Sequence, residues 1–403
     1  MNILFITSLY PTTATGNAFS LTHALHNFVK HWHPQHRIVV ICPVYLYASE
    51  LLKLKKTGKP LQKQFLSIDN IDVIVFPIFK IPKIAYFYYP LYRFLDKYLV
   101  SIDFLPDVVV AHYDKSLEIG FHYSQKRDIP FVAGFHITPD LTEENSSAFT
   151  HRCGKIVEKA SACACRSHAI YNKISGWFPE YKQKCFVAFS GVDETLIVKK
   201  EFALDKLNRW KQGGKISFIT VSSLIERKKI DSIFYALAKF QEETFDWSYT
   251  IIGTGEEWER LETLARTLQI SNRVCFTGPL SHDETISQLK NADIFILVST
   301  LETVGLVYLE AMASGNIVIG SSGEGIDGII ENGRNGFLVP SGDADALYAT
   351  LRKIVRDISR EEMENIIKES LLTIGNYTEQ KASENYLEHL MNIKDSAGKT
   401  EKS

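Results

Sequence analysis

Two glutamates eight positions apart form the sharpest candidate site in this sequence. Glu302 and Glu310 lie in residues 299–315, which follow an apolar run and carry Gly305 between the two acids. A glycine lets the backbone approach a ligand closely, and the free amides at a helix start suit an anionic or hydroxyl-rich ligand. A carboxylate beside them can accept two hydrogen bonds from a sugar or ribose diol. The spacing also fits a helix cap followed by a solvated helix face, so it leaves both interpretations open.

Three other patterns carry weaker signals. Asp343 and Asp345 form a D-x-D pair, which holds a metal–diphosphate in other enzymes. Here the pair follows a Pro-Ser-Gly turn and precedes an apolar run, so we interpret it as a helix cap. Gly253 and Gly255 lack the third glycine of a dinucleotide-binding turn. No His/Cys cluster has the spacing of metal ligands, and we predict no metal site.

The elements that must position these residues are short apolar runs that alternate with longer amphipathic ones, the pattern of parallel β–α units. The runs are nearly continuous in hydrophobicity, as in strands covered on both faces. We expect two series of strands, at residues 2–7, 37–42, 73–76, 107–111, 131–135, 162–165 and 185–188, and then at 216–221, 249–252, 274–276, 294–298 and 317–319.

These two series predict two doubly wound sheets. The polar stretch 194–212 is the expected joint between them. Ser281 and Glu284 predict a capping box at the start of one helix. Ligands in such folds bind beyond the carboxyl ends of the strands, so we expect the site in a cleft between the two sheets.

Length, charge and cysteine usage restrict the class of protein. A chain of 403 residues is long enough for two domains. The formal net charge is -2 with no long basic run, which argues against nucleic-acid binding. The six cysteines form no C-x-x-C pair, so we expect buried, reduced thiols in the cytoplasm. The start lacks the basic region of a signal peptide, and no apolar run reaches the about 20 residues of a membrane span.

Residues 299–315 resemble the E-x7-E signature of family 4 glycosyltransferases, which retain anomeric configuration and have the GT-B fold. The resemblance extends over nearly the whole chain, through segments 190–193, 221–231, 251–255, 274–278 and 332–340. It implies two Rossmann-like domains that face a central cleft. Residues 1–195 would bind the acceptor and 196–375 the nucleotide-sugar. Residues 376–395 would form a helix that packs back on the first domain, and 396–403 a disordered tail.

The resemblance also assigns roles to residues of the second domain. Glu310 would hold the ribose hydroxyls of the donor, and Lys228 would bind its diphosphate, where a cation stabilises the leaving group. A solvated lysine in a basic run is the alternative for Lys228. Glu302 would hold the transferred sugar together with backbone groups, which belong to Thr303, Val304, Gly305 and Leu306.

One donor-binding position departs from the family pattern. The family often has an arginine where this chain has Ser223. A serine can still donate a hydrogen bond, but one charge that would neutralise phosphate is missing. Arg227 is a candidate substitute for that charge.

The first domain matches the family more loosely. Gly16 follows the first strand where the family commonly has a glycine pair, and a plain turn is the alternative. His136 ends a strand at the position that resembles the active-site histidine of the family, where it would act in catalysis with Glu302. A histidine at a strand end is otherwise structural. His112 ends a neighbouring strand, and we expect it one layer behind the site.

The resemblance implies a hexosyltransferase that takes a sugar from a nucleotide-sugar, with UDP favoured over GDP, and needs no metal or other cofactor. The acceptor would be a saccharide or a polyprenyl-linked saccharide in exopolysaccharide, capsule or glycolipid synthesis. Two carboxylates flanking one bond would indicate a glycosidase, but these two glutamates lie on one domain. The alternatives are an impaired sugar-nucleotide-binding protein and a GT-B phosphorylase or epimerase.

One stretch of the first domain suggests contact with a membrane. Residues 51–59 are basic, and residues 79–94 mix aromatic and cationic side chains. Such side chains together suit the interface of an anionic membrane. A packed helix hairpin beside the acceptor pocket is the alternative. We expect a cytoplasmic protein that binds the inner face of the cell membrane peripherally.

Overall fold

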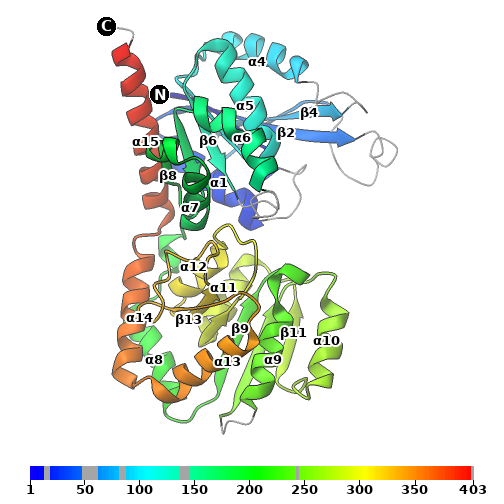
Figure 1. The fold of residues 1–403 in the computed structure, drawn as a ribbon, viewed down its shortest axis with the longest axis vertical. Helices are drawn as coiled ribbons and strands as arrows, with labels where there is room; N and C mark the ends of the chain where they lie inside the picture. Colours follow the sequence, from blue (N-terminus) through cyan, green and yellow to red (C-terminus); the bar gives the residue numbers. More distant parts are fainter. Residues whose placement is uncertain (13–18, 48–61, 81–87, 137–145, 242–244, 401–403) are drawn as a thin grey trace. The chain divides into compact units, whose positions relative to one another are not determined.

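The computed structural model describes residues 1–12, 19–47, 62–80, 88–136, 146–241 and 245–400. Its internal contacts divide the chain into two units, which are described separately (Figure 1). The first unit comprises Met1–Arg166, Ile170–Phe189 and Gln380–Ser403, and the second comprises Ser167–Ala169 and Ser190–Glu379. The first unit therefore takes its last helix from the far end of the chain.

The first unit is built on a sheet of eight strands in the order β3-β4-β2-β1-β5-β6-β7-β8. Only β3 runs antiparallel to its neighbour. The central strands β1, β5 and β6 are buried along nearly their whole length, as their continuous apolar sequences predict. The strands are β1 (Asn2–Thr7), β2 (Arg37–Tyr47), β3 (Gln64–Ile68), β4 (Ile71–Lys80), β5 (Val108–His112), β6 (Phe131–Phe135), β7 (Ala162–Cys165) and β8 (Cys185–Val187).

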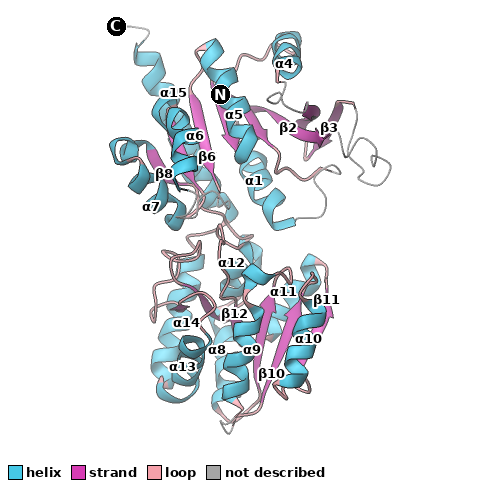
Figure 2. Ribbon diagram, turned by 45° about the vertical axis from the view of Figure 1, so that its right-hand side comes forward, coloured by secondary structure: helices cyan, strands magenta, loops and turns pink. Residues whose placement is uncertain are grey.

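Helices cover both faces of this sheet (Figure 2). One face carries α4 (Tyr89–Ser101), α5 (Asp114–Arg127), α6 (Ser146–Lys159) and α7 (His168–Trp177). The other face carries α1 (Phe19–Trp32) and α15 (Glu379–Thr400). A 3-10 turn at Pro179–Lys184 leads into β8.

The second unit has six parallel strands in the order β11-β10-β9-β12-β13-β14. They are β9 (Ile216–Val221), β10 (Trp247–Ile252), β11 (Val274–Gly278), β12 (Ile294–Ile296), β13 (Ile317–Ser321) and β14 (Phe337–Val339). The helices are α8 (Lys200–Lys211), α9 (Ile230–Phe240), α10 (Trp258–Thr267), α11 (His282–Asn291), α12 (Leu306–Ala313), α13 (Ala344–Arg352) and α14 (Arg360–Ile374). Short 3-10 turns lie at Glu194–Leu196 and Glu226–Lys228, and a π-helical segment at Lys353–Asp357 follows α13.

The prediction of two doubly wound α/β sheets is confirmed, with two local corrections. The stretch 194–212 is not a joint, because its helix α8 buries Ala203, Leu207 and Trp210 in the core of the second unit. Residues 396–400, expected to be disordered, continue α15 to Thr400. The remaining tail residues lie outside the described part of the chain.

The structure confirms the predicted caps at the starts of two helices, α11 and α13. Ser281 and Glu284 form the predicted capping box at α11. The Asp343 carboxylate accepts hydrogen bonds from the amides of Asp345 and Ala346, at 3.0 and 2.9 Å. The D-x-D pair is thus a cap of α13.

The described cysteines are free thiols, and most are buried as expected. Cys42, Cys153, Cys163 and Cys165 lie in the core of the first unit, and Cys185 is half-buried beside them. Cys275 in β11 is exposed, contrary to the expectation of buried thiols.

The aromatic and basic stretch is only partly described. Residues 51–59 and 81–87 lie outside the described residues. From Tyr89 onward the chain forms α4, which buries Leu91 and Leu95. The Phe94 ring packs against the Phe76 ring, at 5.4 Å between centroids. No helix in the described part of the chain is both long enough and apolar enough to span a membrane.

Apart from the three residues Ser167–Ala169, the chain passes between the units after Phe189 and again after Glu379. Just inside the second unit, the two passages are paired. The Val192 amide donates to the Tyr377 carbonyl at 2.9 Å, and the Glu379 amide donates to the Val192 carbonyl at 3.0 Å. A Cβ on Gly191 would lie 2.3 Å from the Thr378 carbonyl oxygen, so only glycine allows this close approach.

Candidate functional site

The loop between β12 and α12 carries Glu302. It needs two residues with positive φ, Leu301 at 54° and Gly305 at 68°. Gly305 is the N-cap of α12, and a Cβ there would lie 2.7 Å from the Tyr308 ring and 3.3 Å from Glu302 Cγ. Glycine therefore lets the loop turn tightly into the helix, which leaves the first amides of α12 beside Glu302.

The Glu302 carboxylate is paired with cations from the turn Glu226–Lys228, which follows β9. Its Oε2 atom accepts a hydrogen bond from Lys228 Nζ and one from Ser299 Oγ at 3.3 Å, and Arg227 Nη1 lies 3.8 Å away. The side chains of Lys228 and Glu302 are only 9% and 13% exposed. In such surroundings, each charge depends on the other for compensation. The structure thus brings two of the sequence-predicted site residues into direct contact.

Backbone contacts lock the β9 turn to the Glu302 loop. The Thr300 amide donates to the Arg227 carbonyl at 2.8 Å, and Arg227 Nη1 donates to the Leu301 carbonyl at 3.2 Å. Arg227 therefore contacts the loop itself, and its side chain remains 41% exposed.

A second loop, which follows β13, holds the loop of Glu302 in place through hydrogen bonds. Glu324 Oε2 accepts a hydrogen bond from the Glu302 amide at 2.8 Å, and the Gly325 amide donates to the Glu302 carbonyl at 3.0 Å. A Cβ on Gly325 would lie 1.9 Å from the Thr303 carbonyl oxygen. Sequence reasoning missed this support, although two glycines beside an acid at 323–325 are the signal that could have suggested it.

Glu310 lies on α12 and is also paired. Its Oε1 atom lies 2.9 Å from Nε2 of His282, the first residue of α11. The hydrogen bond to Glu310 raises the pKa of His282 above its usual value, against the opposing effect of partial burial. Sequence reasoning missed His282, because nothing local links it to a residue 28 positions away.

Ser223 lies exposed just beyond β9. The neighbouring turns after β9 and β10 are in close contact. A Cβ on Gly253 would lie 1.9 Å from the Ser222 carbonyl oxygen, and one on Gly255 would lie 2.1 Å from the Leu224 carbonyl oxygen. Close contact between the two turns is therefore what requires these two glycines.

In the first unit, His136 directly follows β6 and contacts His112 at the end of β5. His136 Nε2 lies 3.0 Å from His112 Nδ1, and His112 Nε2 lies 2.8 Å from the hydroxyl of Tyr386 on α15. Burial, and then the nearby Arg166 cation, hold the pKa of His136 well below its ordinary value. Burial, and then His136, likewise hold the pKa of His112 well below its ordinary value, so both imidazoles are neutral near pH 7. Sequence reasoning placed His112 behind His136 but missed Tyr386.

The structure leaves two of the expectations for the site untested, the role of Gly16 and the joint role of His136 and Glu302. Gly16 lies outside the described residues. His136 belongs to the first unit and Glu302 to the second. Their joint role in catalysis is therefore a proposal.

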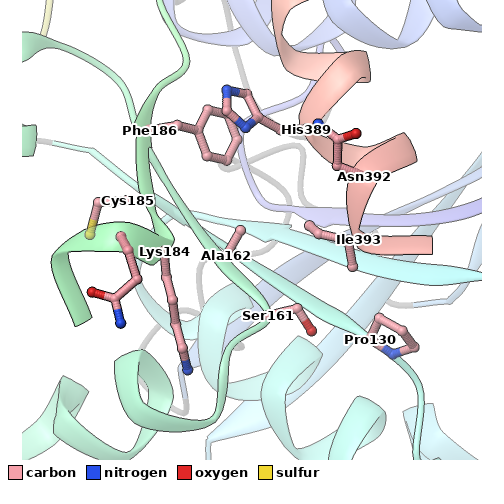
Figure 3. A pocket seen from close by; sticks show the side chains of 10 residues that line it. Pro130, Ser161, Ala162, Lys184, Cys185, Phe186, His389, Asn392 and Ile393 are labelled. Atoms are coloured by element: carbon pink, nitrogen blue, oxygen red, sulfur yellow. The ribbon is translucent and has the colours of Figure 1, made fainter. Parts of the chain in front are cut away.

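A cavity of about 420 Å³ lies at the other end of the first sheet (Figure 3). Pro130, Ser161 and Lys184 line it, and each directly precedes a strand, whereas His136 follows one. His389 of α15 stacks on Phe186 in this cavity, at 3.8 Å between ring centroids. Because parallel strands place their amino ends together, this cavity is not part of the site around His136.

Within the described ranges, no group of three or more His, Cys, Asp or Glu side chains is arranged to hold a metal ion. The second unit carries the N-terminus of α12, the Lys228–Glu302 pair in the loop before it, and Glu310 one turn along the same helix. Such a set can bind an anion and a diol together.

A family model described as "Glycosyl transferases group 1" matches residues 205–393. The chain is 26% identical over 305 residues to a putative colanic acid biosynthesis glycosyltransferase, WcaL, of Salmonella typhimurium, and the match covers 72% of each chain. It is 31% identical over 173 residues to the lipopolysaccharide core biosynthesis glycosyltransferase LpsE of Rhizobium meliloti, which covers 43% of this chain and 48% of LpsE.

Among solved structures, the Anabaena protein HepE in complex with UDP has a similar fold. The TM-score is 0.69 with 19% sequence identity, over 97% of this chain and 100% of HepE. The similarity thus includes both units, whereas the family model covers mainly the second.

Proposed function

Because this chain belongs to the group 1 glycosyltransferases, family 4 with the GT-B fold, we propose that it transfers a hexose from a nucleotide-sugar with retention of configuration. The acceptor is a saccharide or a lipid-linked saccharide in the synthesis of a surface polysaccharide or glycolipid. The observation that supports this best is the Lys228–Glu302 pair beside the free amides of α12. The turn after β9 offers a cation, and the loop before α12 offers an anion-binding backbone and a diol acceptor in contact with it.

In this proposal, Lys228 binds the donor diphosphate and stabilises the charge that develops on the leaving group. Glu310 accepts hydrogen bonds from the ribose hydroxyls. Glu302 accepts them from the transferred sugar, together with the backbone at Thr303, Val304, Gly305 and Leu306. Since Lys228 is already paired with Glu302, the diphosphate must share or displace that contact when the donor binds.

The first unit supplies the acceptor side and His136. We infer that neutral His136 forms a hydrogen bond to the transferred sugar or the phosphate while the acceptor attacks from the same face that the nucleotide leaves. Gly16 and Ser223 line the donor site as backbone and hydroxyl contacts. The reaction needs no metal, because the charge of the leaving group is met by Lys228 and the α12 amides.

The relatives favour a uridine donor. Structures of the Anabaena protein were solved with UDP and with UDP-glucose. The names of WcaL and LpsE point to colanic acid and lipopolysaccharide core, which are both surface glycans. We therefore propose UDP-hexose before GDP-hexose as the donor.

Thermal stability with a nucleotide panel tests the donor site. The purified protein is heated with UDP, GDP, ADP, CMP or dTDP, with and without magnesium. A ligand at about 100 times its Kd adds about 2.7 kcal/mol to the free energy of unfolding, or roughly 5–10 °C in Tm. We expect this shift for UDP, equal in both buffers. Glu310→Ala should remove it, whereas the exposed Glu361→Ala should not. No shift with any nucleotide would contradict the donor site.

Product analysis tests the reaction class. With the donor so identified, we expect turnover only when a hydroxyl-bearing acceptor is added, and a product with the anomeric configuration of the donor. Phosphorolysis or epimerisation without an acceptor would replace this proposal. Binding of the nucleotide without turnover, over a broad set of acceptors, would identify an impaired binding protein.

We also propose peripheral contact with an anionic membrane through the aromatic and basic stretch, since a lipid-linked acceptor lies at a membrane surface. Flotation with vesicles containing anionic lipid should carry the protein upward, less so at high salt. Absence of flotation at low salt would exclude this contact.

A further inference from the structure

Three buried side chains form a hydrogen-bonded chain from the last helix to His136. His136 Nε2 lies 3.0 Å from His112 Nδ1, and His112 Nε2 lies 2.8 Å from the Tyr386 hydroxyl. His112 and Tyr386 are fully buried, and His136 is 7% exposed. His112 ends β5, His136 follows β6 and Tyr386 lies on α15, so separate parts of the first unit meet here.

Packing holds each ring of this chain in place. His112 stacks on Phe5, at 5.5 Å between centroids and 24° between planes. Tyr386 meets the Phe28 and Trp32 rings edge-to-face, at 5.2 and 5.1 Å. Rings fixed on several sides cannot turn to other partners, so the hydrogen-bonded geometry is preorganised.

The backbone of β6 also makes room for His112. A Cβ on Gly134 would lie 2.0 Å from His112 Nδ1, the atom that contacts His136. Any side chain at this position would push the imidazole away. The glycine two residues before His136 is therefore a requirement of the contact between the two histidines.

The direction of the hydrogen bonds follows from counting protons. Neutral His112 has one N–H and one lone pair, so the chain runs either from Tyr386 to His136 or the reverse. In the reverse direction, Tyr386 would accept from His112 and its own buried proton would need another acceptor. Among the described residues, the Tyr386 hydroxyl has no other hydrogen-bond partner. A donor left unsatisfied on the fully buried Tyr386 is unfavourable, whereas His136 is 7% exposed and its Nδ1 is not among the buried polar atoms without a partner. Tyr386 therefore donates to His112, and His112 Nδ1–H donates to His136 Nε2.

We propose that Tyr386 and His112 are positioning residues that hold His136 in the tautomer protonated on Nδ1, so that it donates a hydrogen bond to the oxygens of the donor. This inference rests on the proposed role of His136. The described residues offer Nδ1 of His136 no hydrogen bond. With the other tautomer, a lone pair would face the phosphate or sugar oxygen and repel it.

Tyr386→Phe tests the inference, because it removes only the hydroxyl and keeps the ring packing. We expect kcat to fall about tenfold, the effect of about 1.4 kcal/mol on a barrier, with KM for the donor little changed. Long-range 1H–15N correlation spectra of protein labelled on histidine report the tautomer directly. We expect a single Nδ1–H form of His136 in the parent and exchange between two forms in Tyr386→Phe. His136→Ala assigns the signals by their loss.

His389→Ala is the matched control on the same helix. It removes the stacking on Phe186 in the cavity and leaves the hydrogen-bonded chain intact (Figure 3). We expect a lower Tm with parental kcat and an unchanged His136 tautomer. Equal losses of kcat in His389→Ala and Tyr386→Phe would mean that α15 packing alone matters, and would overturn the inference.

The two hypotheses fail in different ways. Parental kcat in His136→Ala would overturn the proposed catalytic role of His136, and the positioning role with it. Loss of activity in His136→Ala, together with parental kcat and a single tautomer in Tyr386→Phe, would overturn only the positioning role. The spectra need no donor or acceptor, so they decide the tautomer independently of the assay.

Discussion

At the scale of single residues, the two candidate donor-binding carboxylates already have side-chain partners that can carry a positive charge. Glu302 is paired with Lys228, and Glu310 with His282. A donor that uses these carboxylates must compete with the existing contacts. The binding of the donor should therefore respond to the charge of each partner.

The His282–Glu310 pair predicts that nucleotide affinity depends on pH. The pKa of His282 is raised by its hydrogen bond to Glu310, so the pair stabilises the protein fully below about pH 6.5 and loses this effect as pH rises through the raised pKa. Over the same window, Glu310 becomes free for ribose hydroxyls. We expect the Kd for UDP, measured by calorimetry, to fall as pH rises above about 6.5. His282→Gln should flatten this dependence, and a flat profile in the parent would contradict it.

The Lys228–Glu302 pair makes a different prediction, for stability. Lys228→Met leaves a mostly buried carboxylate with weaker partners, and we expect the free energy of unfolding in urea to fall by about 3 kcal/mol. Adding Glu302→Gln removes the orphaned charge and should restore part of this loss, while transfer activity stays absent in both. Parental stability of Lys228→Met alone would show that the pair is not needed for folding.

At the scale of elements, the candidate site depends on loops that support one another. The loop before α12 is held by the β9 turn on one side and by the loop after β13 on the other. No helix or strand contains Glu302. Its geometry is therefore sensitive to glycines outside the motif.

Gly325→Ala tests this support. The new Cβ would collide with the Thr303 carbonyl, at 1.9 Å, and push the Glu302 loop out of place. We expect a loss of nucleotide affinity of about tenfold or more, equivalent to about 1.4 kcal/mol, with a modest drop in Tm. Gly323→Ala is the control, because its φ of 74° adds strain but its Cβ would meet open space. Similar affinity losses in both variants would remove the specific role of Gly325.

A helix or strand can be predicted when its own residues form a recognisable pattern. Buried strands such as β6 and β9 were predicted with their observed bounds, because a continuous apolar run carries its own signal. The edge strand β3 was not predicted, since its residues are largely exposed and it pairs antiparallel through a turn at Asp69 and Asn70. The fold class can thus be predicted from the sequence, but the edge strand of the first sheet cannot.

The same reasoning explains which candidate site residues could be identified from the sequence and which could not. Glu302, Glu310 and Lys228 were identified through motif resemblance, and the Lys228–Glu302 contact fits that pattern. Glu324 and Tyr386 were not, because they act through partners 22 and 274 positions away. Contacts over such separations leave no periodic or local trace in one sequence.

At the scale of the whole molecule, the first unit is discontinuous in sequence. Its core includes Ala382, Tyr386 and Leu390 of α15, packed beside Phe28 and Trp32 of α1. The second unit, by contrast, is almost one uninterrupted stretch. Loss of the C-terminal residues should therefore affect the two units unequally.

A chain ending at Glu379 tests this inequality. We expect the first unit to lose at least the about 3–5 kcal/mol that a buried aromatic contributes, and transfer activity to disappear. The second unit should retain its stabilisation by UDP, seen as a Tm shift and as protection from protease. A chain ending at Asp395 keeps the buried residues of α15 and should behave as the parent. Loss of UDP binding in the shorter chain would show that the second unit depends on α15.

The return of the chain to the first unit also has a consequence for its synthesis. A ribosome delivers residues 190–379 as one stretch, which can fold as soon as it has emerged. The core around Trp32 must wait for α15, because its indole donates to the carbonyl of Ser383, 351 positions later. The first unit is thus synthesised first and completed last. Until α15 has been made, the apolar face that it covers stays exposed and can be bound by chaperones.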